Sequence, residues 1–348
     1  MANKKLYPIK FVSETDQMKW GLATWIIADM GFENSKISNG WLEGNSIEDL
    51  METYLERVVG ENVYEYYGRQ FPILVKYLQV DGEIPLQVHP SDVEAEERWD
   101  SLGKTELLYI KQAEKNAKIY IGFNREITAQ EFFERTNNGS IYEVLNEFQL
   151  KQGEAYLITP GLVHAVKGRV DLIAIQQSSD LDFVLYAKGL TKEEEELRFL
   201  HLSEAIDFID YSKYSLEKTN SSEEVVEKLA SRPEFTISRL KLSDTLHIYT
   251  EKFESFLIYV CAEGGASIDL ERNATKDSFE FKKGEAILIP AELPDFYLVP
   301  KTKDTVLLEV MIEKHEILDS YIDPNTEPFL EDEDYGGLED EYSEGLDN

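Results

Sequence analysis

Short apolar runs separated by turn residues recur along most of the chain, and this pattern predicts many β-strands. Some runs alternate apolar with polar side chains and others are apolar throughout, as expected of half-buried and fully buried strands. Many short strands with turns between them are typical of antiparallel barrels or sandwiches, so we predict a mainly β fold. The predicted strands are residues 71–80, 106–110, 117–123, 155–159, 171–176, 182–186, 235–242, 256–262, 266–270, 286–290 and 305–312.

Helices are predicted between some of these strands, each from a capping signal at its start. A serine or threonine followed three residues later by an acidic residue satisfies free backbone N–H groups in the first turn of a helix. The signals are Ser46 with Asp49 (helix to about Val59), Thr128 with Glu131, and Thr191 with Glu194 (an acidic helix ending near Asp210).

One strand-turn unit occurs twice in the sequence. Residues 151–160 read KQGEAYLITP, and residues 282–290 read KKGEAILIP. Repetition of such a unit indicates a duplicated architecture, so we predict two barrels of jelly-roll type with helical insertions. We expect a first domain at 1–212, a polar linker at 213–232, a second domain at 233–315 and an acidic, flexible tail at 316–348.

Composition limits the class of protein. The chain has 348 residues, 42% of them hydrophobic, and a net charge of −33, which suits a soluble globular protein of more than one domain. Its acidity disfavours a nucleic-acid partner. We expect no membrane association, because the sequence has no apolar run of spanning length and no signal-peptide core. The single cysteine, Cys261, cannot form an intramolecular disulfide, and we expect a cytoplasmic protein.

Residues with metal-binding chemistry lie in three separate segments. Gln87 and His89 are two residues apart and share one face of an extended strand. Glu106 begins an apolar run, and His164 follows a proline turn. Two imidazoles, a carboxylate and an amide oxygen suit a borderline divalent cation such as zinc. The alternative is that the histidines are ordinary hydrogen-bonded polar groups. The second copy of the repeated unit lacks a histidine here, so we expect no metal in the second barrel.

Taken in order, the motifs resemble those of the type I phosphomannose isomerases, also called mannose-6-phosphate isomerases, which interconvert mannose 6-phosphate and fructose 6-phosphate. The resemblance covers most of residues 6–210 and continues more weakly through the second barrel. The segments that carry it are Trp20-Gly21, Asn39-Gly40, residues 71–76 (FPILVK), 87–90 (QVHP), 103–106 (GKTE), 161–165 (GLVHA), 176–180 (QQSSD) and Leu200-His201.

The resemblance implies a cupin core with a helical insertion and a second cupin-like domain. It implies Gln87, His89, Glu106 and His164 as ligands of one Zn²⁺, or another divalent metal, per chain. The implied activity is aldose–ketose isomerisation in carbohydrate metabolism, and the implied partner is a small sugar phosphate. We expect a monomer or a weak homodimer.

The reaction moves a proton between C1 and C2 of the sugar, and it needs a base and a group that holds the phosphate. The resemblance implies a pocket role for Lys76 and places Ser178, Ser179 and Asp180 beside the substrate. We predict Lys76 and Asp180, the latter as a replacement base, as catalytic residues. We predict Lys76, Arg69, Ser178 and Ser179 as substrate-binding residues. The alternatives are that Lys76, at the end of an apolar run, reaches solvent, and that the serines and Asp180 cap a turn.

The sequence also departs from the family. Relatives resembling this chain carry a glutamate where it has Ala174 and an arginine, implied in proton transfer, where it has Val184. One alternative is therefore a divergent paralogue that binds a sugar or sugar phosphate at an intact metal site without isomerising it. Another is a different cupin activity, with these two residues forming an apolar wall for a less charged ligand. We expect His201 to pack rather than to act chemically.

Overall fold

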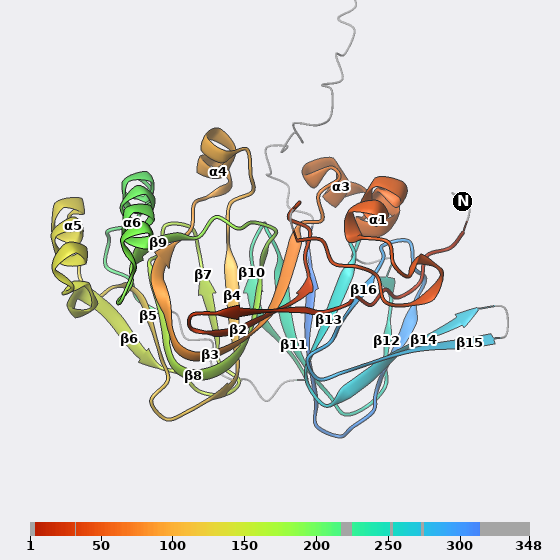
Figure 1. Cartoon of the computed structure of the whole chain (residues 1–348). Coiled ribbons are helices and arrows are strands. Elements are labelled where there is room, and N and C mark those ends of the chain that lie inside the picture. Colours follow the sequence, from red (N-terminus) through yellow and green to blue (C-terminus); the bar gives the residue numbers. More distant parts are fainter. Residues whose placement is uncertain (1–3, 32, 217–224, 251–252, 273–274, 314–348) are drawn as a thin grey trace, which may run out of the picture.

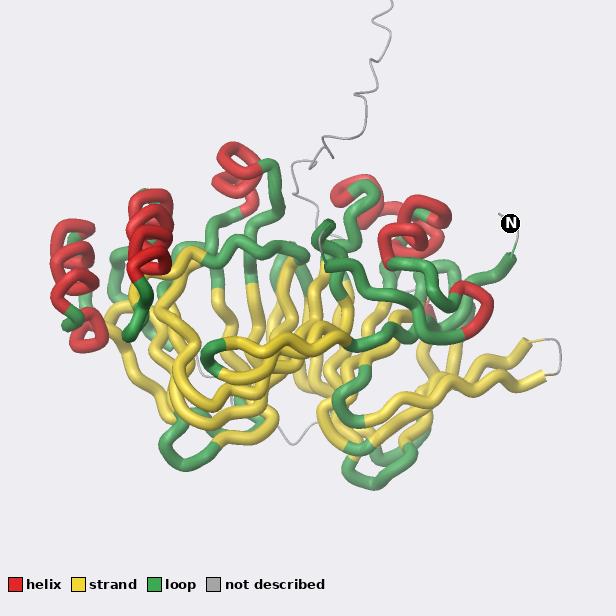
Figure 2. The backbone as a smooth tube through the Cα atoms, in the orientation of Figure 1, coloured by secondary structure: helices red, strands yellow, loops and turns green. Residues whose placement is uncertain are grey.

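Two antiparallel β-barrels lie side by side in the computed structural model, and the helices lie along one edge of both (Figures 1 and 2). The structure describes residues 4–31, 33–216, 225–250, 253–272 and 275–313. The predicted acidic tail and part of the predicted linker lie outside these residues. No helix in the described ranges is long and apolar enough to cross a membrane.

The first barrel contains a nine-stranded sheet with β1, β2, β3, β8, β4 and β7 in that order. β9 pairs with β3, β5 with β8, and β6 with β5. The strands are β1 (Glu14–Met18), β2 (Gly21–Ile27), β3 (Ile73–Val88), β4 (Glu106–Ala113), β5 (Lys118–Phe123), β6 (Leu145–Gln149), β7 (Ala155–Ile158), β8 (His164–Gln177) and β9 (Phe183–Tyr186).

The second barrel contains two sheets, ordered β10-β11-β18-β13-β16 and β12-β17-β14-β15. Its strands are β10 (Val226–Ser231), β11 (Thr236–Leu242), β12 (Leu246–Ile248), β13 (Leu257–Glu263), β14 (Gly265–Arg272), β15 (Thr275–Lys282), β16 (Ala286–Ile289), β17 (Phe296–Pro300) and β18 (Thr305–Met311). The predicted mainly β fold of two barrels is confirmed.

β3 and β8 are longer than predicted, and their extra residues build the site. The predicted strand ended at Val80, before Pro85, but β3 continues to Val88. A register shift between Ile84 and Gln87 places the proline where the ladder is interrupted, so its missing N–H costs little. Beyond this shift, β3 also pairs with β9, which gives the end of β3 a second neighbour.

The capping signals mark helix starts as predicted. Ser46, Thr128 and Thr191 each accept a hydrogen bond from the backbone N–H three residues later. Two predicted helix ends were wrong. The first helix is interrupted at Leu55, where φ is 46°, and the acidic helix ends at Ala205. The helices are α1 (Ile47–Tyr54), α2 (Glu56–Val59), α3 (Glu61–Tyr67), α4 (Asp92–Trp99), α5 (Ala129–Asn138) and α6 (Lys192–Ala205), with 3₁₀ turns η1 (Gly40–Leu42) and η2 (Ile141–Val144).

The repeated unit forms the same turn in both barrels. Gly153 and Gly284 have φ of 82° and 85°, which glycine adopts without a steric penalty. Gly153 donates its N–H to the carbonyl of Ile110 on β4 at 2.8 Å, and Gly284 donates to Cys261 on β13 at 2.9 Å. The following strands, β7 and β16, then pair with β4 and β13. These matching hydrogen bonds confirm the duplication.

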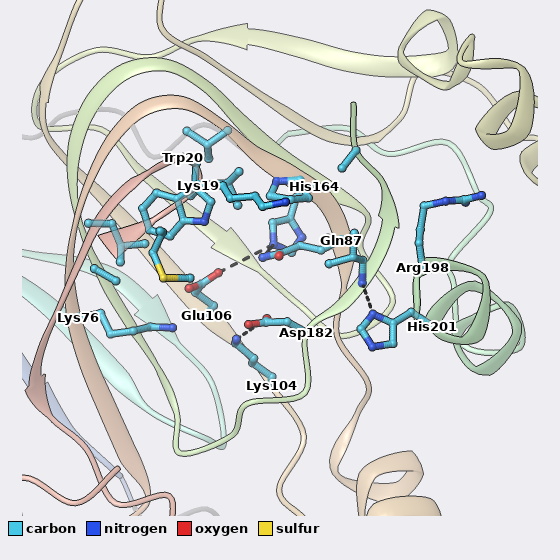
Figure 3. Close-up of a pocket in the computed structure, with 18 of the residues that line it drawn as sticks. Lys19, Trp20, Lys76, Gln87, Lys104, Glu106, His164, Asp182, Arg198 and His201 are labelled. Atoms are coloured by element: carbon cyan, nitrogen blue, oxygen red, sulfur yellow. Dashed lines mark hydrogen bonds and ion pairs between the residues drawn. The ribbon is translucent and has the colours of Figure 1, made fainter. Parts of the chain in front are cut away.

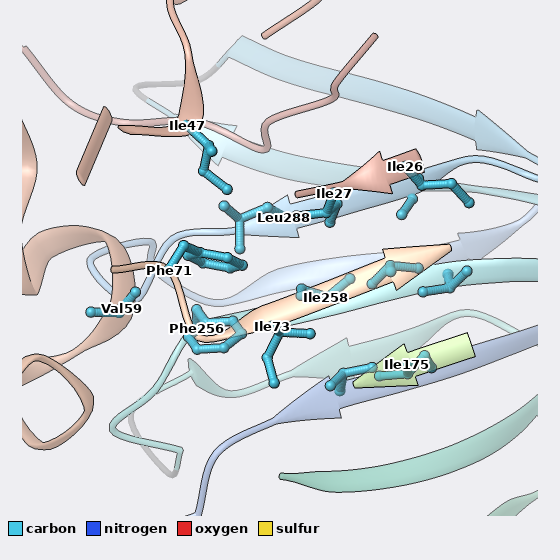
Figure 4. Packing of buried hydrophobic residues seen from close by; sticks show 14 of the residues in the cluster. Ile26, Ile27, Ile47, Val59, Phe71, Ile73, Ile175, Phe256, Ile258 and Leu288 are labelled. Carbon is cyan, nitrogen blue, oxygen red and sulfur yellow. The ribbon is translucent and has the colours of Figure 1, made fainter. Parts of the chain in front are cut away.

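The two barrels share a hydrophobic core. Buried side chains of the first barrel, including Phe71, Ile73 and Ile175, belong to one cluster with Phe256 and Ile258 of the second barrel (Figure 4). Burial of apolar area of this kind contributes about 25 cal/mol per Å². The contact therefore fixes the second barrel against the start of β3 and the end of β8, which lie opposite the strand ends that carry Gln87 and His164.

Candidate metal centre and cavity

Three strand ends bring the predicted metal ligands together. Gln87 is near the end of β3 with His89 just beyond it, Glu106 begins β4, and His164 begins β8. Nε2 of Gln87 lies 3.2 Å from Nε2 of His164. Oε2 of Glu106 lies 3.9 Å from Nε2 of His89 and 4.0 Å from Nε2 of His164. Ligand atoms of the two histidines and the glutamate all lie within 4.8 Å of one another.

The donor set fits a divalent cation. Nδ1 of His164 lies 3.0 Å from the carbonyl of Leu162, and Nδ1 of His89 lies 3.2 Å from that of Leu181. If both Nδ1 atoms donate to these carbonyls, each Nε2 turns a lone pair to the cluster. Nε2 of His89 is fully buried and has no hydrogen-bond partner, an arrangement that costs free energy without a ligand.

Burial also favours the neutral form of the two histidine rings, which is the form that binds a metal. Loss of hydration lowers the pKa of His89 well below its usual value, and nearby Lys104 adds to the effect. Loss of hydration likewise lowers the pKa of His164. Rotating the Gln87 amide by half a turn would direct its oxygen to the cluster and complete a four-donor set. Three of the sequence-predicted ligands, His89, Glu106 and His164, thus form a buried group that could hold a metal, and partly buried Gln87 lies beside it.

The cluster borders a cavity of about 440 Å³, a size usual for small-molecule sites (Figure 3). β1 and β2, the turn between them, β3, β4, β8, β9 and α6 contribute to its wall. The lining residues are Met18, Lys19, Trp20, Ala23, Trp25, Lys76, Leu78, Ile84, Pro85, Gln87, Lys104, Glu106, Leu108, His164, Val166, Asp182, Val184, Ala187, Leu190, Glu194, Leu197, Arg198 and His201.

Lys76 differs from the other cations of the cavity wall. Lys104 lies 2.5 Å from Asp182, Lys19 pairs with Glu194, and Arg198 pairs with Glu195. Lys76, in contrast, has no carboxylate within ion-pair distance in the described residues. Loss of hydration, aided by Lys104, lowers the pKa of Lys76 to about 8. An ammonium group that lines a cavity and has no carboxylate partner is suited to bind an anion.

Known proteins resemble this chain over most of its length. No protein-family model matches the chain. It is 29% identical to the mannose-6-phosphate isomerase ManA of Bacillus subtilis, over 79% of the chain and 85% of that protein. It is 24% identical to the mannose-6-phosphate isomerase of Streptococcus mutans, over 76% of the chain and 81% of that protein. The chain resembles the mannose-6-phosphate isomerases.

Solved structures share the fold of this mannose-6-phosphate isomerase-like chain. The crystal structure of the Bacillus subtilis mannose 6-phosphate isomerase matches with a TM-score of 0.75 at 23% identity, covering 88% of this chain and 99% of that one. A mutant of phosphomannose isomerase from Salmonella typhimurium matches with a TM-score of 0.72 at 15% identity, covering 89% of this chain and all of that one. The duplicated barrel architecture is therefore shared with these isomerases.

Several residues predicted from the isomerase resemblance do not line the cavity. Asp180 and Arg69 are exposed and are not part of its wall. Ser178 and Ser179 are buried in the turn between β8 and β9. The N–H of Ser178 donates to the carbonyl of Pro72 at 2.9 Å, and Ser179 accepts a hydrogen bond from Gln176 at 3.1 Å. In this arrangement the serines hold the turn, and Lys76 is the predicted catalytic residue that the cavity contains.

Asp182 is a site residue that the sequence reasoning missed. Its Oδ1 lies 2.5 Å from Nζ of Lys104 and 3.2 Å from Nδ1 of His89. Burial opposes ionisation of this carboxyl, but the nearby ammonium groups, Lys104 foremost, outweigh burial and hold the pKa of Asp182 below its usual range. Asp182 therefore orients a predicted metal ligand and neutralises a cation of the wall at the same time.

The two departures from the isomerase family occupy different places. Ala174 is fully buried on β8, opposite Lys76 on β3, in the core of the first barrel. Val184, on β9, lines the cavity, and its backbone N–H donates to Nδ1 of His201 at 3.1 Å. His201, which we expected only to pack, thus lies in the cavity wall as well. Its motif, Leu200-His201, was a signal for the family but not for this contact.

Proposed function

We propose that this protein is a metal-dependent aldose–ketose isomerase that interconverts mannose 6-phosphate and fructose 6-phosphate. The observation that carries the proposal is the buried group of His89, Glu106 and His164 beside a cavity that contains Lys76. Sequence relatives named mannose-6-phosphate isomerases support it.

Gln87, His89, Glu106 and His164 would hold Zn²⁺ or another divalent cation, one per chain. A bound cation of this kind supplies Lewis-acid stabilisation of negative charge on the two reacting sugar oxygens. The protein contributes a site that keeps both imidazoles neutral and excludes water from the histidine nitrogens. Asp182 keeps the His89 ring in one orientation through its contact with Nδ1.

Lys76 is the residue to which we assign the substrate phosphate. In its ammonium form it attracts the phosphate as a point charge, and Trp25, whose ring centroid lies 5.1 Å from Nζ, steadies the side chain. Because the pKa of Lys76 is about 8, part of the population is neutral near physiological pH. That neutral fraction would make Lys76 a base for the carbon-bound proton only in a complex where the phosphate lies elsewhere, because one amine cannot hold the phosphate as a cation and accept this proton at the same time.

A second candidate function is binding of a sugar phosphate without isomerisation. The observation that favours it is the cavity wall around Val184, where an arginine of the family is absent and Asp182 neutralises Lys104. Loss of one preorganised charge stabiliser typically costs about 10²–10³ in rate. A protein with this wall would then retain the ligand and lose the turnover.

The deciding experiment is a coupled assay of fructose 6-phosphate formation from mannose 6-phosphate on zinc-loaded protein. Exchange of the C2 proton with deuterium from solvent is followed in parallel by NMR. Turnover that disappears in His164→Ala supports the isomerase. The isomerase would be rejected if the protein showed no turnover and no exchange while it held stoichiometric zinc and bound mannose 6-phosphate in calorimetry. The binding protein would then remain.

A further inference from the structure

The cavity wall formed by β9 and α6 offers two polar atoms that neither the metal group nor Lys76 uses. They are Oδ2 of Asp182, beside β9, and Nε2 of His201, on α6. Both residues line the cavity, and Figure 3 shows them on neighbouring parts of the wall.

His201 presents a hydrogen-bond donor to the cavity. The backbone N–H of Val184 donates to Nδ1 at 3.1 Å, so Nδ1 must carry a lone pair. On a neutral ring the proton is then on Nε2. Loss of hydration lowers the pKa of His201, which favours this neutral ring. Within the described residues, Nε2 makes no hydrogen bond of its own.

Asp182 presents an acceptor to the same space. Its Oδ1 is occupied by Lys104 and His89. Its Oδ2 accepts no hydrogen bond in the described part of the chain, and the side chain is 37% exposed and lines the cavity. An acceptor beside a neutral donor matches a sugar hydroxyl, which can donate to one and accept from the other. A phosphate at this place would face the carboxylate and be repelled.

We propose that Asp182 and His201 bind hydroxyl groups of the sugar and so determine which sugar the site accepts. This inference rests on the proposed function, because it assumes a sugar phosphate as the ligand. It also orients that ligand, with the phosphate at Lys76 and hydroxyls of the sugar at the β9–α6 wall. The uncharged Val184 side chain fits this division, since the wall then has no cation free to compete for the phosphate.

The test measures binding of mannose 6-phosphate to zinc-loaded protein by calorimetry. His201→Phe keeps a ring for the edge-to-face contact with Phe183, whose centroid lies 5.6 Å away, but removes the Nε2 donor together with the Nδ1 acceptor of the Val184 N–H. We expect its Kd to rise about tenfold, the usual effect of one lost hydrogen bond. His201→Gln, which restores a donor near the same point, should recover most of this loss. His247→Phe, a matched change in the second barrel, should leave binding unchanged.

Deoxy sugars test the same contact without any mutation. The 3-deoxy and 4-deoxy analogues of mannose 6-phosphate are titrated into the wild-type protein and into His201→Phe. At least one analogue should bind the wild type about tenfold more weakly than the parent sugar, and this difference should vanish in the variant. Equal binding of both analogues and the parent sugar by the wild type would overturn the inference.

These outcomes separate the inference from the proposed function. A wild type that binds mannose 6-phosphate without isomerising it rejects the isomerase alone. A wild type that isomerises, with a Kd that is the same in His201→Phe, rejects the role of the Asp182–His201 wall alone. A wild type that does not bind the sugar phosphate at all rejects both.

Discussion

Thr105 and Glu234 form a hydrogen bond across the junction between the two barrels, with Oγ1 of Thr105 donating to Oε1 of Glu234 at 3.0 Å. Thr105 is fully buried next to Glu106, and Glu234 lies in the turn between β10 and β11. The N–H of Thr105 also donates to the side-chain oxygen of Gln177 at 2.8 Å. The second barrel therefore helps to hold the segment that carries a predicted metal ligand.

Thr105→Val should weaken metal binding because it removes this support without changing the shape of the side chain. We expect zinc affinity to fall by about tenfold, the lower end of the usual effect of a supporting residue. The partly buried Glu234 carboxylate loses a partner, so the free energy of unfolding should also fall by about 1 kcal/mol. Competition with a chelator measures the affinity.

The matched control is Thr15→Val, which removes an exposed hydrogen bond of the same length to Thr24 on β2. It should change neither zinc affinity nor stability measurably. If Thr105→Val lowered stability but left the zinc affinity at the control's value, the contact would serve folding alone.

Lys76 should make sugar-phosphate binding depend on pH. A lysine is cationic below its pKa and neutral above it, and loss of hydration lowers the pKa of Lys76 to about 8. Binding of mannose 6-phosphate should therefore weaken as pH rises from 7 to 9, while the phosphate stays fully ionised. Lys76→Met should bind about tenfold more weakly at pH 7 and show no such decline.

Lys76→Arg is the informative companion, because a guanidinium stays charged throughout this pH range. It should retain binding at pH 9 at its pH 7 level. A decline of the same size in Lys76→Arg and the wild type would show that another group titrates.

The grouping of Gln87, His89, Glu106 and His164 could be predicted because each residue belongs to a short motif at a strand end. The order of the motifs also carried the family resemblance. Asp182 could not be predicted in this way, because its role arises from a turn that brings it against His89, far away in the sequence. His201 likewise depends on a single backbone N–H of Val184. Neither contact leaves a pattern in the residues around it.

Helix α4 was missed although its signal is present. Ser91 and Glu94 form a complete capping box at its start, of the same kind as those that correctly predicted α1 and α6. The helix has eight residues, of which only Ala95 is buried, so it shows no apolar periodicity. The strand that corresponds to β3 was predicted too short for a different reason. A proline such as Pro85 argues against a strand unless a register shift accommodates it.

Asp29→Asn should change how stability depends on pH. Asp29 is buried, and the N–H of Phe71 donates to its Oδ2 at 2.7 Å. Loss of hydration raises its pKa to about 6, above the value of about 3.9 in an unfolded chain. The folded state thus binds this proton more tightly. The stability gained from it is complete below pH 4 and is lost as pH rises to about 6.

An asparagine can still accept the Phe71 hydrogen bond and does not ionise. At pH 7 the variant should therefore be more stable than the wild type by up to about 2–3 kcal/mol, with the difference disappearing near pH 4. Urea unfolding of both proteins at pH 7 and pH 4 measures this difference in the free energy of unfolding. The contributions of the other titrating groups are the same in both proteins and cancel. A difference that does not change with pH would mean that folding leaves the pKa of Asp29 at its unfolded value.

Restoring the two family residues should raise turnover if the rest of the isomerase site is intact. The double variant Ala174→Glu with Val184→Arg places a carboxylate opposite Lys76 and a cation in the cavity wall. Each charge stabiliser is typically worth about 10²–10³ in rate, so we expect at least a tenfold gain in kcat for mannose 6-phosphate.

Ala174→Glu alone should not give this gain, because the new carboxylate would pair with Lys76 and leave no added cation for the substrate. Val184→Arg alone should tighten phosphate binding and raise kcat less than the pair. If the folded double variant turned over no faster than the wild type, the divergence from the isomerases would extend beyond these two positions, and Asp182, which now neutralises Lys104, would be the next residue to change.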